Sequence, residues 1–432
     1  MKWLEYYLNH TTSAEEAVKA VKSGDRVVLG HACGEPQVIV DALVARAGEL
    51  EGVEIAHEVP MGKGTYCLPQ YEKSFRHNAL FAGKPSRQAI KDGRADYTSI
   101  FLHELPELFT SGKFPIDVAM VTVSPTDAKG YVSLGVSVDY TLQAIKSASM
   151  VIAEVNPNMP VTGPSSLISV EEIDYFVPVD IPLIAQQPPH IGEVEKTIGQ
   201  NIAELIHDGD CLQLGIGAVP DAILSFLQDK NDLGIHSEMI SDGVMRLAQQ
   251  GVVNCSRKNY YPGKIVIAFA MGTAEFYQWL DHNPLIEALP VTITNQPYSI
   301  AKNDNMVAIN SALSVDLLGQ VAADTLAGIQ FSGVGGQVDF IRGANNSKGG
   351  RAIIALPATA ANGSISRIVT TLAPGQAVTT SRYDVDMVVT EYGVAHLKWK
   401  TNRERARALI NIAAPEFRDT LREEYNQIYG GL

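Results

Sequence analysis

The sequence lacks the features that mark secreted and membrane-spanning proteins. Its 432 residues include four cysteines, which form no C-x-x-C pair and show no regular spacing: Cys33, Cys67, Cys211 and Cys255. This pattern favours reduced thiols over a disulfide framework or a zinc site. The N-terminus has no apolar signal-peptide core, and runs such as IVIAFAM at 265–271 are too short to cross a bilayer. We therefore expect a cytoplasmic protein with no membrane partner.

Basic clusters and common catalytic motifs are also missing. Acidic residues outnumber basic ones by 48 to 34, the formal net charge is −14, and no Lys/Arg block could neutralise a run of phosphates. Nucleic acid is therefore excluded as a partner. The ten histidines form no H-E-x-x-H motif, so no metal site is predicted, and the absence of G-x-S-x-G disfavours a serine hydrolase.

What the sequence does contain is an internal repeat. Residues 13–16, Ser-Ala-Glu-Glu, have the form of a helix cap, and the helical pattern after them leads through Gly24-Asp25 to the apolar strand RVVLG. The same order returns 185 residues later, where IGQNIAELI leads through Gly209-Asp210 to CLQLG. LGVSVDY in the first half likewise resembles VGGQVDF in the second.

The repeat predicts two similar α/β domains. We place them at residues 1–190 and 191–432, with Pro188-Pro189 in the linker between them. Apolar runs such as DVAMVTV, MVIAEV, KIVIAFA and RAIIALP alternate with helical patterns, which is typical of mostly parallel sheets covered on both faces. Ligands in such folds bind at the carboxyl ends of the strands.

One candidate ligand site is the turn LGIGAVPDAI at 214–223. A strand that ends at Gly215, a turn at Gly217 and a helix that begins at Pro220 would direct free backbone N–H groups at a phosphate or a pantetheine arm. Pro220 stands where the third glycine of G-x-G-x-x-G belongs, which weakens a dinucleotide-binding interpretation. A tight turn without a ligand is the alternative.

Glu238, in GIHSEMISDG, is the candidate catalytic group. It follows Gly215 by 23 residues, close to the spacing of the acid that binds ribose in dinucleotide-binding folds. The same place at a strand end suits a carboxylate that attacks a thioester. An exposed loop carboxylate is the third interpretation.

A glycine-rich loop, FSGVGGQVDFIRGA at 331–344, supplies the third motif. Gly333, Gly335 and Gly336 let the backbone approach a ligand closely and can present N–H groups as an oxyanion hole, although most such loops are simple turns. We expect Gln337 and Asp339 to fix this loop by hydrogen bonds.

Other polar residues carry weaker signals. We expect Glu391, at the end of the DMVVTEYG run, to have a structural role. His31, Glu35 and the loop 61–66 follow predicted strand ends of the first half. For these we favour core packing or loop structure over contact with an acyl group.

Taken together, these motifs resemble the acetyl-CoA hydrolase/transferase family along essentially the whole chain. The resemblance is carried by several long motifs in a fixed order, VSPTDAKGYVSLGVSVDYT, LQLGIGAVPDA, LGIHSEMISDG, FSGVGGQVDFIRGA, VVTEYGVA and RARALINIAAPEFR. It implies two domains of the class I CoA-transferase type (NagB/RpiA-like) and a homodimer. It also implies a catalytic nucleophile at Glu238, and we expect the glycine-rich loop to supply its oxyanion hole at Gly335 and Gly336. The coenzyme A contacts that it implies are Gln213, Leu214, Gly215, Ile216, Gly217, Leu313 and Gly336.

The resemblance further implies a reaction. Coenzyme A would move between a short acyl-CoA and acetate by ping-pong chemistry through a glutamyl-CoA thioester, with coenzyme A as substrate and no other cofactor. The sequence leaves the acyl group open among 4-hydroxybutyryl, butyryl, propionyl and succinyl. It also leaves open an acyl-CoA hydrolase, an NAD-dependent dehydrogenase and a catalytically silent CoA-binding regulator.

Overall fold

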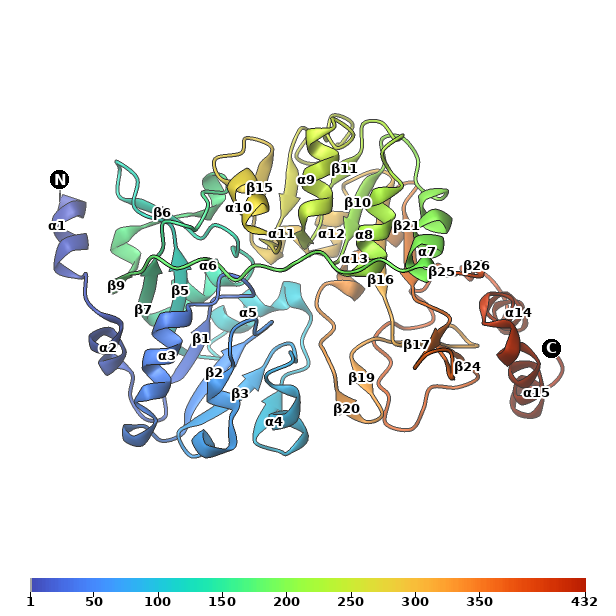
Figure 1. Ribbon diagram of the computed structural model, residues 1–432, viewed down its shortest axis with the longest axis horizontal. Helices are drawn as coiled ribbons and strands as arrows, with labels where there is room; N and C mark the ends of the chain where they lie inside the picture. Colours follow the sequence, from blue (N-terminus) through green and yellow to red (C-terminus); the bar gives the residue numbers. More distant parts are fainter. Residues whose placement is uncertain (1) are drawn as a thin grey trace. The chain divides into compact units, whose positions relative to one another are not determined.

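The computed structural model describes residues 2–432, and the chain forms two compact units (Figure 1). The first unit comprises Met1–Gln187 and Val266–Thr294, and the second comprises Pro188–Ile265 and Asn295–Leu432. The expected boundary near residue 190 lies close to the point where the chain first passes from one unit to the other, between Gln187 and Pro188. The expected continuous domain 191–432 differs from this division. Residues 266–294 belong to the first unit.

Backbone hydrogen bonds explain why this segment packs with the first unit. The N–H of Ala270 donates to the carbonyl of Val136 at 2.9 Å, and the N–H of Val291 donates to that of Asp139 at 3.1 Å. Because these bonds join residues that are far apart in the chain, the local sequence pattern gives no sign of them.

The first unit is built on a seven-stranded sheet in which every neighbouring pair is parallel. In sheet order the strands are β4 (Ala95–Tyr97), β3 (Phe75–Ala79), β2 (Val53–His57), β1 (Arg26–Leu29), β5 (Ile116–Val123), β7 (Ala148–Val155) and β9 (Tyr175–Pro178). Strand β5 is buried at all but one of its eight residues, as expected for a central strand covered on both faces.

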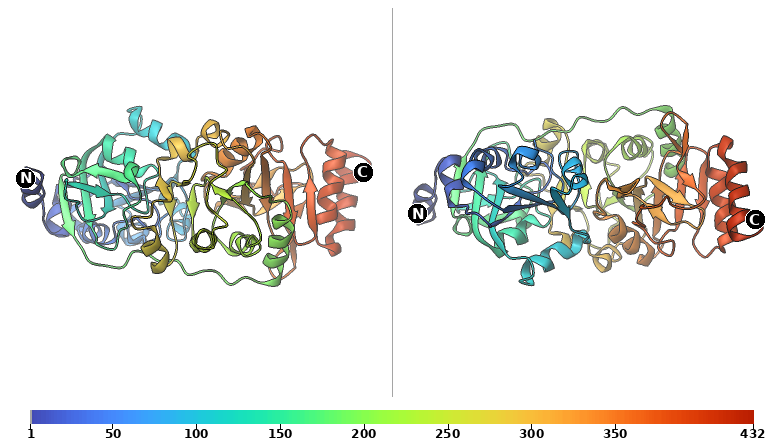
Figure 2. Two further views of the ribbon diagram at one scale, coloured as in Figure 1. Left: turned by 90° about the horizontal axis from the view of Figure 1, so that it is seen from above. Right: turned by 90° about the horizontal axis from the view of Figure 1, so that it is seen from below.

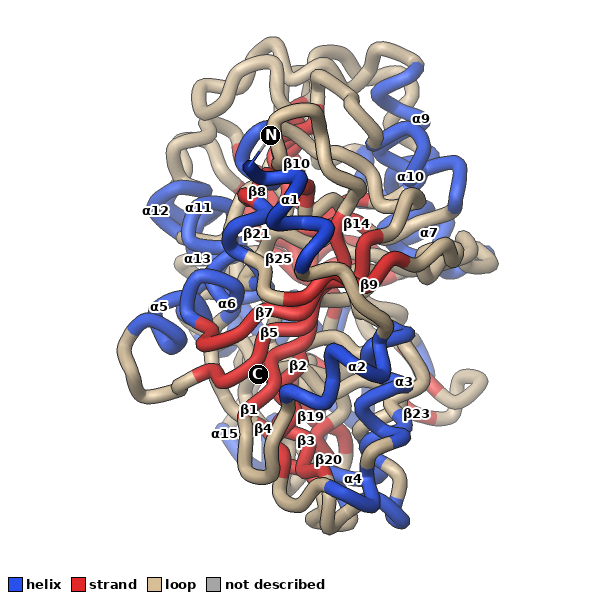
Figure 3. Tube along the Cα trace, turned by 90° about the vertical axis from the view of Figure 1, so that its left-hand side faces the viewer, coloured by secondary structure: helices blue, strands red, loops and turns tan. Residues whose placement is uncertain are grey.

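Helices cover both faces of this sheet. Figure 3 shows α2 (Ala14–Ala17) and α3 (Gln37–Ala45) on one side of the strands, and α5 (Leu105–Thr110) and α6 (Thr141–Ser147) on the other. The remaining helices of the unit are α1 (Lys2–Asn9), α4 (Arg87–Lys91), α10 (Ala274–Leu280) and α11 (Val291–Thr294). The predicted cap is confirmed, since the Ser13 side chain accepts a hydrogen bond from the N–H of Glu16 at 3.3 Å.

A buried glutamate of β7 caps helix α3. The helix follows Pro36, which has no side chain that could bind its free N–H groups. Instead, Oε1 of Glu154 accepts a hydrogen bond of 2.8 Å from the N–H of Ile39. Burial raises the pKa of Glu154 to about 7, although the hydrogen bonds from Ile39 and Val38 oppose this rise.

This elevated pKa predicts a pH-dependent stability. The folded state holds a proton on Glu154 up to about pH 7, whereas the unfolded chain loses it near its ordinary value of 4.5. The free energy of unfolding should therefore fall as pH rises from about 4.5 to 7. Glu154→Gln keeps a carbonyl acceptor and removes the titration, so its stability relative to wild type should rise between pH 5 and pH 8 by on the order of 2–3 kcal/mol.

Urea unfolding at the two pH values measures this difference. Glu51→Gln, which changes an exposed acid of the same unit, is the control and should show little change with pH. An equal effect of Glu154→Gln at both pH values would contradict the prediction.

The second unit contains a six-stranded sheet that is parallel except for its last pair. In sheet order the strands are β11 (Gly234–Ile235), β10 (Cys211–Leu214), β16 (Met306–Ser311), β21 (Arg351–Ala355), β25 (Met387–Thr390) and β26 (Gly393–His396). Its helices are α7 (Glu193–Ala203), α8 (Ala218–Ser225), α9 (Asp242–Gln249), α12 (Pro297–Ile300), α13 (Gln337–Asn346), α14 (Asn402–Ile412) and α15 (Arg418–Tyr429). Helix α13 packs on β16 and β21, and Figure 2 shows α14 and α15 side by side at the end of the chain.

The two sheets share part of their strand order, as expected for the two similar domains that the repeat predicts. In each, the first repeat strand (β1 or β10) lies between the strand that follows it (β2 or β11) and a later strand (β5 or β16). The fold class is thus confirmed as α/β with mostly parallel sheets. The run KIVIAFA differs from expectation, because it forms parts of small two-stranded sheets that include β14 (Phe269–Ala270).

No helix within residues 2–432 is long and apolar enough to cross a membrane.

Candidate active site

Glu238 lies shortly after β11, an edge strand of the second unit. It stands in the short connection between β11 and β12 (Met239–Ile240) and is half-buried, while its neighbours on both sides are buried. An exposed loop carboxylate is therefore the wrong interpretation. Because β11 pairs in parallel with β10, Glu238 lies at the edge of the sheet where ligands bind in this fold class.

Two hydrogen bonds fix this connection to β10. The N–H of His236 donates to the carbonyl of Leu212 at 3.1 Å, and Oγ of Ser237 donates to the carbonyl of Leu214 at 3.2 Å. Ser237 also lines a small pocket with Leu214 and Gly215. The predicted turn and the candidate nucleophile are thus brought together.

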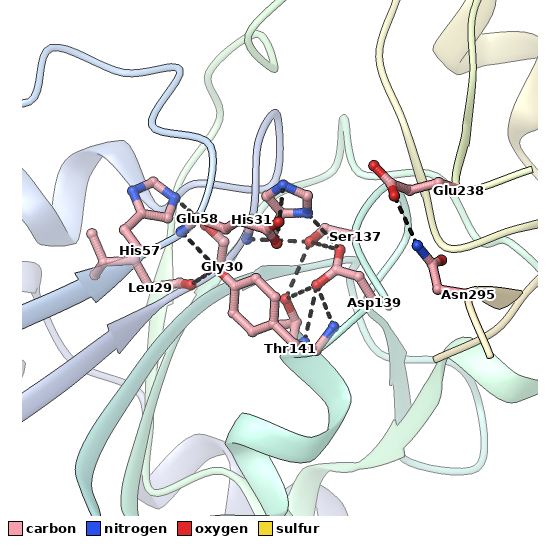
Figure 4. A network of polar contacts seen from close by, with 11 residues as sticks. Leu29, Gly30, His31, His57, Glu58, Ser137, Asp139, Thr141, Glu238 and Asn295 are labelled. Carbon is pink, nitrogen blue, oxygen red and sulfur yellow. Dashed lines mark hydrogen bonds and ion pairs between the residues drawn. The ribbon is translucent and has the colours of Figure 1, made fainter. Parts of the chain in front are cut away.

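Asn295 holds the carboxylate of Glu238. Its side-chain amide donates a hydrogen bond of 2.8 Å to Oε2 of Glu238, as Figure 4 shows. The two residues are 57 positions apart in the chain, and Asn295 follows α11 in a segment without any motif. Sequence reasoning missed this residue, and no local pattern could have revealed it.

The backbone of Gly336 packs closely against the same carboxylate. A Cβ atom at this position would lie 2.0 Å from Oε2 of Glu238 and 2.5 Å from Nδ2 of Asn295, so a side chain there would displace one of them. Gly336 also precedes the first residue of α13. The partial positive charge of this helix N-terminus favours a carboxylate or a developing oxyanion.

Gln337 holds the glycine-rich loop as expected, whereas the hydrogen bonds expected of Asp339 stay a prediction. Gly335 adopts a left-handed backbone with φ of 50°, which glycine tolerates without strain. Nε2 of Gln337 donates to the carbonyl of Ser311 at 3.2 Å, which ties the loop to the end of β16. The oxyanion hole at Gly335 and Gly336 stays a prediction, and of the two residues Gly336 lies against the Glu238 carboxylate.

The turn at 213–217 has the expected strand-turn-helix form with one correction. Helix α8 begins at Ala218 after Gly217, whose φ is 118°, so Pro220 is the third helical residue and not the first. Proline is tolerated there because the first-turn N–H groups have no helical partner. The side chain of Gln213 pairs with Asn310, whose Nδ2 donates to its Oε1 at 3.0 Å.

Ile216 and Leu313 remain candidate ligand contacts. The side chain of Ile216 is exposed in the turn. Leu313 is half-buried just beyond β16, and its N–H donates to the carbonyl of Ala322 at 2.9 Å. Both lie in the second unit, beyond the carboxyl ends of β10 and β16 respectively.

A buried polar network lies in the first unit (Figure 4). Nδ1 of His31 lies 3.1 Å from Oδ2 of Asp139, and its Nε2 lies 3.7 Å from Oε2 of Glu58. Asp139 also accepts hydrogen bonds from Ser137 and Thr141. Burial alone would raise the pKa of Asp139, but the charge of His31 and these hydrogen bonds lower it. The sequence predicted a core or loop role for His31 and did not predict its partners.

Glu35 fixes the loop 61–66. Its Oε2 accepts hydrogen bonds from the N–H groups of Met61 at 3.0 Å and Gly62 at 2.7 Å. Burial raises the pKa of Glu35 to about 7, against the effect of these two bonds. Glu35 therefore has the loop-structural role that we favoured.

Glu391 has a structural contact too, because its Oε2 accepts a hydrogen bond of 2.8 Å from the N–H of Ala358. All four cysteines are buried and none forms a disulfide. Within residues 2–432 no cluster of three or more His, Cys, Asp or Glu side chains is arranged to hold a metal ion.

The chain is an α/β protein with two mostly parallel sheets. Its candidate nucleophile is a half-buried carboxylate, which is held beside a glycine at a helix N-terminus. The chain belongs to the acetyl-CoA hydrolase/transferase family. The model of the N-terminal domain of this family matches residues 1–185, and that of the C-terminal domain matches residues 272–425.

Several proteins are similar to this chain over almost its full length. The chain is 55% identical to the 4-hydroxybutyrate coenzyme A transferase of Clostridium kluyveri, over 99% of this chain and 100% of that protein. The crystal structure of a 4-hydroxybutyrate CoA-transferase from Porphyromonas gingivalis is 42% identical with a TM-score of 0.86, over 99% of this chain and 100% of that one. RipA from Yersinia pestis is 37% identical with a TM-score of 0.95 and the same coverage.

Proposed function

We propose that the protein is a CoA-transferase that moves coenzyme A between a short acyl-CoA and acetate, with 4-hydroxybutyryl-CoA as the preferred thioester. The observation that carries the proposal is the Glu238 carboxylate, fixed by Asn295 against Gly336 at the start of α13. The preference for 4-hydroxybutyrate rests on the identity of 55% to a transferase of that name. Butyryl-CoA:acetate transfer and acyl-CoA hydrolysis are the alternatives on the same scaffold.

In the proposed mechanism Glu238 attacks first. Its carboxylate adds to the thioester carbonyl, the C–S bond breaks, and an acyl–glutamyl anhydride and a CoA thiolate result. The N–H groups of Gly335 and Gly336 stabilise the tetrahedral oxyanion. The thiolate then attacks the glutamyl carbonyl, and the first acid leaves as its carboxylate.

The second half of the cycle reverses these steps. The enzyme now carries a glutamyl-CoA thioester, which acetate attacks to give a mixed anhydride and a thiolate. The thiolate takes the acetyl group and Glu238 is regenerated. A carboxylate suits this role because its anhydride and thioester both remain reactive, so the proposal includes no metal or redox cofactor. It also includes a homodimer, which rests on the family resemblance, and a cytoplasmic location, which rests on the sequence.

Trapping the covalent intermediate tests the proposal. The protein is incubated with butyryl-CoA or 4-hydroxybutyryl-CoA without an acceptor acid, treated with borohydride and digested for mass spectrometry. We expect reduction of Glu238 to its alcohol, loss of activity and protection by acetate. An unmodified Glu238 with steady release of free acid would favour the hydrolase, and no reaction with either thioester would contradict both activities.

Asn295→Ala should slow the reaction strongly without unfolding the protein. The substitution removes the hydrogen bond that orients Glu238, and removal of one such preorganised donor typically lowers kcat by about 10²–10³. Asn201→Ala is the matched control, since Asn201 is a half-buried asparagine of the same unit that donates to the carbonyl of Thr390 at 3.0 Å. Steady-state kinetics should separate the two variants, and similar kcat values for both would contradict the role of Asn295.

A further inference from the structure

Arg367 presents a half-buried guanidinium at the carboxyl edge of the sheet of the second unit. It lies between β23 (Ile365–Ser366) and β24 (Ile368–Val369). Its backbone N–H donates to the carbonyl of Ala358 at 2.8 Å, and its carbonyl accepts from the N–H of Val315 at 2.9 Å. These bonds place Arg367 beside the segment that follows β21 and against β17 (Ser314–Asp316).

The side chain is poorly engaged by the protein. Nη1 donates to the carbonyl of Ala312 at 3.4 Å, close to the limit of a hydrogen bond, and the buried Nε has no partner within residues 2–432. In the same range no carboxylate oxygen lies within 4.0 Å of the guanidinium. Burial lowers the pKa of Arg367, while the more distant charge of Glu391 raises it. That carboxylate is engaged by the N–H of Ala358.

A second arginine of this unit shows what a structural guanidinium looks like in the fold. The three nitrogens of Arg405 each donate to a main-chain carbonyl at 2.8 Å, those of Leu318, Leu397 and Arg382. A buried guanidinium that is merely structural has its donors satisfied in this way. Arg367 does not, so its position is unexplained by packing alone.

Arg367 is linked to the candidate active site through the end of β16. Its Nη1 contacts the carbonyl of Ala312, and the preceding carbonyl, that of Ser311, accepts the hydrogen bond from Gln337. Gln337 directly follows Gly336, which lies against Glu238. The same two-residue stretch of main chain therefore supports both the cation and the glycine-rich loop.

We propose that Arg367 binds an oxyanion of the substrates, either a phosphate of coenzyme A or the carboxylate of the acid. The inference rests on the proposed function, because both substrates of that reaction are anions. The chain carries a formal net charge of −14, so anionic substrates need a specific cation near the site. A guanidinium presents paired N–H groups that match the oxygens of phosphate and carboxylate.

The test compares Arg367→Gln and Arg367→Lys with wild type and with Arg403→Gln, which removes the same charge from an exposed position. Calorimetry gives the Kd for coenzyme A, 3′-dephospho-CoA and pantetheine, and kinetics gives the KM for acetate. We expect Arg367→Gln to weaken one anionic substrate by about ten- to a hundredfold, the usual range for a lost charge-assisted hydrogen bond. Arg367→Lys should restore part of this loss, and Arg403→Gln should behave as wild type.

The pattern of losses identifies the oxyanion. If Arg367→Gln weakens binding of coenzyme A but not of dephospho-CoA, Arg367 binds the 3′-phosphate. If it weakens binding of both but not of pantetheine, Arg367 binds the diphosphate. If it raises only the KM for acetate, Arg367 binds the carboxylate of the acid. Unchanged values for every ligand, in a variant that melts as wild type does, would overturn the inference while leaving the transferase proposal intact. Wild-type protein that binds coenzyme A without exchange would overturn the transferase proposal alone, and one that does not bind it would overturn both.

Discussion

Glu238→Gln is expected to abolish acyl exchange, with kcat at least about 10⁴-fold lower, the scale seen when a covalent nucleophile is removed. The amide has nearly the shape of the carboxylate, so the surrounding hydrogen bonds can persist, but it cannot form the anhydride or the thioester. Exchange of labelled acetate into acetyl-CoA measures the loss. Borohydride should no longer modify position 238.

The matched control is Glu204→Gln, which removes one exposed acid from the same unit. It should exchange acetate at the wild-type rate. If Glu238→Gln retained more than a small part of the activity in protein free of wild-type enzyme, another residue would have to be the nucleophile. Retained binding of coenzyme A by Glu238→Gln would show that its effect is on chemistry.

Gly336→Ala should also lower kcat strongly, although less than loss of the nucleophile. The added Cβ would lie 2.0 Å from Oε2 of Glu238, so the carboxylate or the loop must move by more than an ångström. Displacement of a reacting group on this scale typically costs about 10²-fold or more in rate. We expect the loss in kcat, with a smaller change in the free energy of unfolding, because the φ of Gly336 is −91° and suits alanine.

Gly48→Ala serves as the control, since a Cβ at that glycine meets no atom within 4 Å. It should leave kcat unchanged. A crystal structure of Gly336→Ala should show Glu238 turned away from Asn295, and an undisturbed carboxylate together with wild-type activity would contradict the predicted close approach.

Some of the fold could be predicted because local signals and global packing agree. The apolar, β-branched runs at 26–29 and 116–123 form buried central strands. The repeat predicted two similar domains, and their sheets share the strand order around β1 and β10. The run at 264–270 shows where this reasoning fails. Apolar periodicity reports burial, but it does not say which sheet a short strand joins, and this segment joins small sheets through non-local pairs.

For the candidate site too, some features could be predicted from the sequence and others depend on the fold. By itself, the sequence determined that an acid follows a short strand at Glu238 and that a glycine loop is available at 333–336, since both depend on residue type and local spacing. Only the tertiary structure decided that Asn295 donates a hydrogen bond to this acid and that Gly336 has no room for a side chain. It also decided that Arg367 lies at the same sheet edge without a carboxylate partner. These relations join segments tens of residues apart, and no local pattern encodes a contact that forms only when the chain has folded.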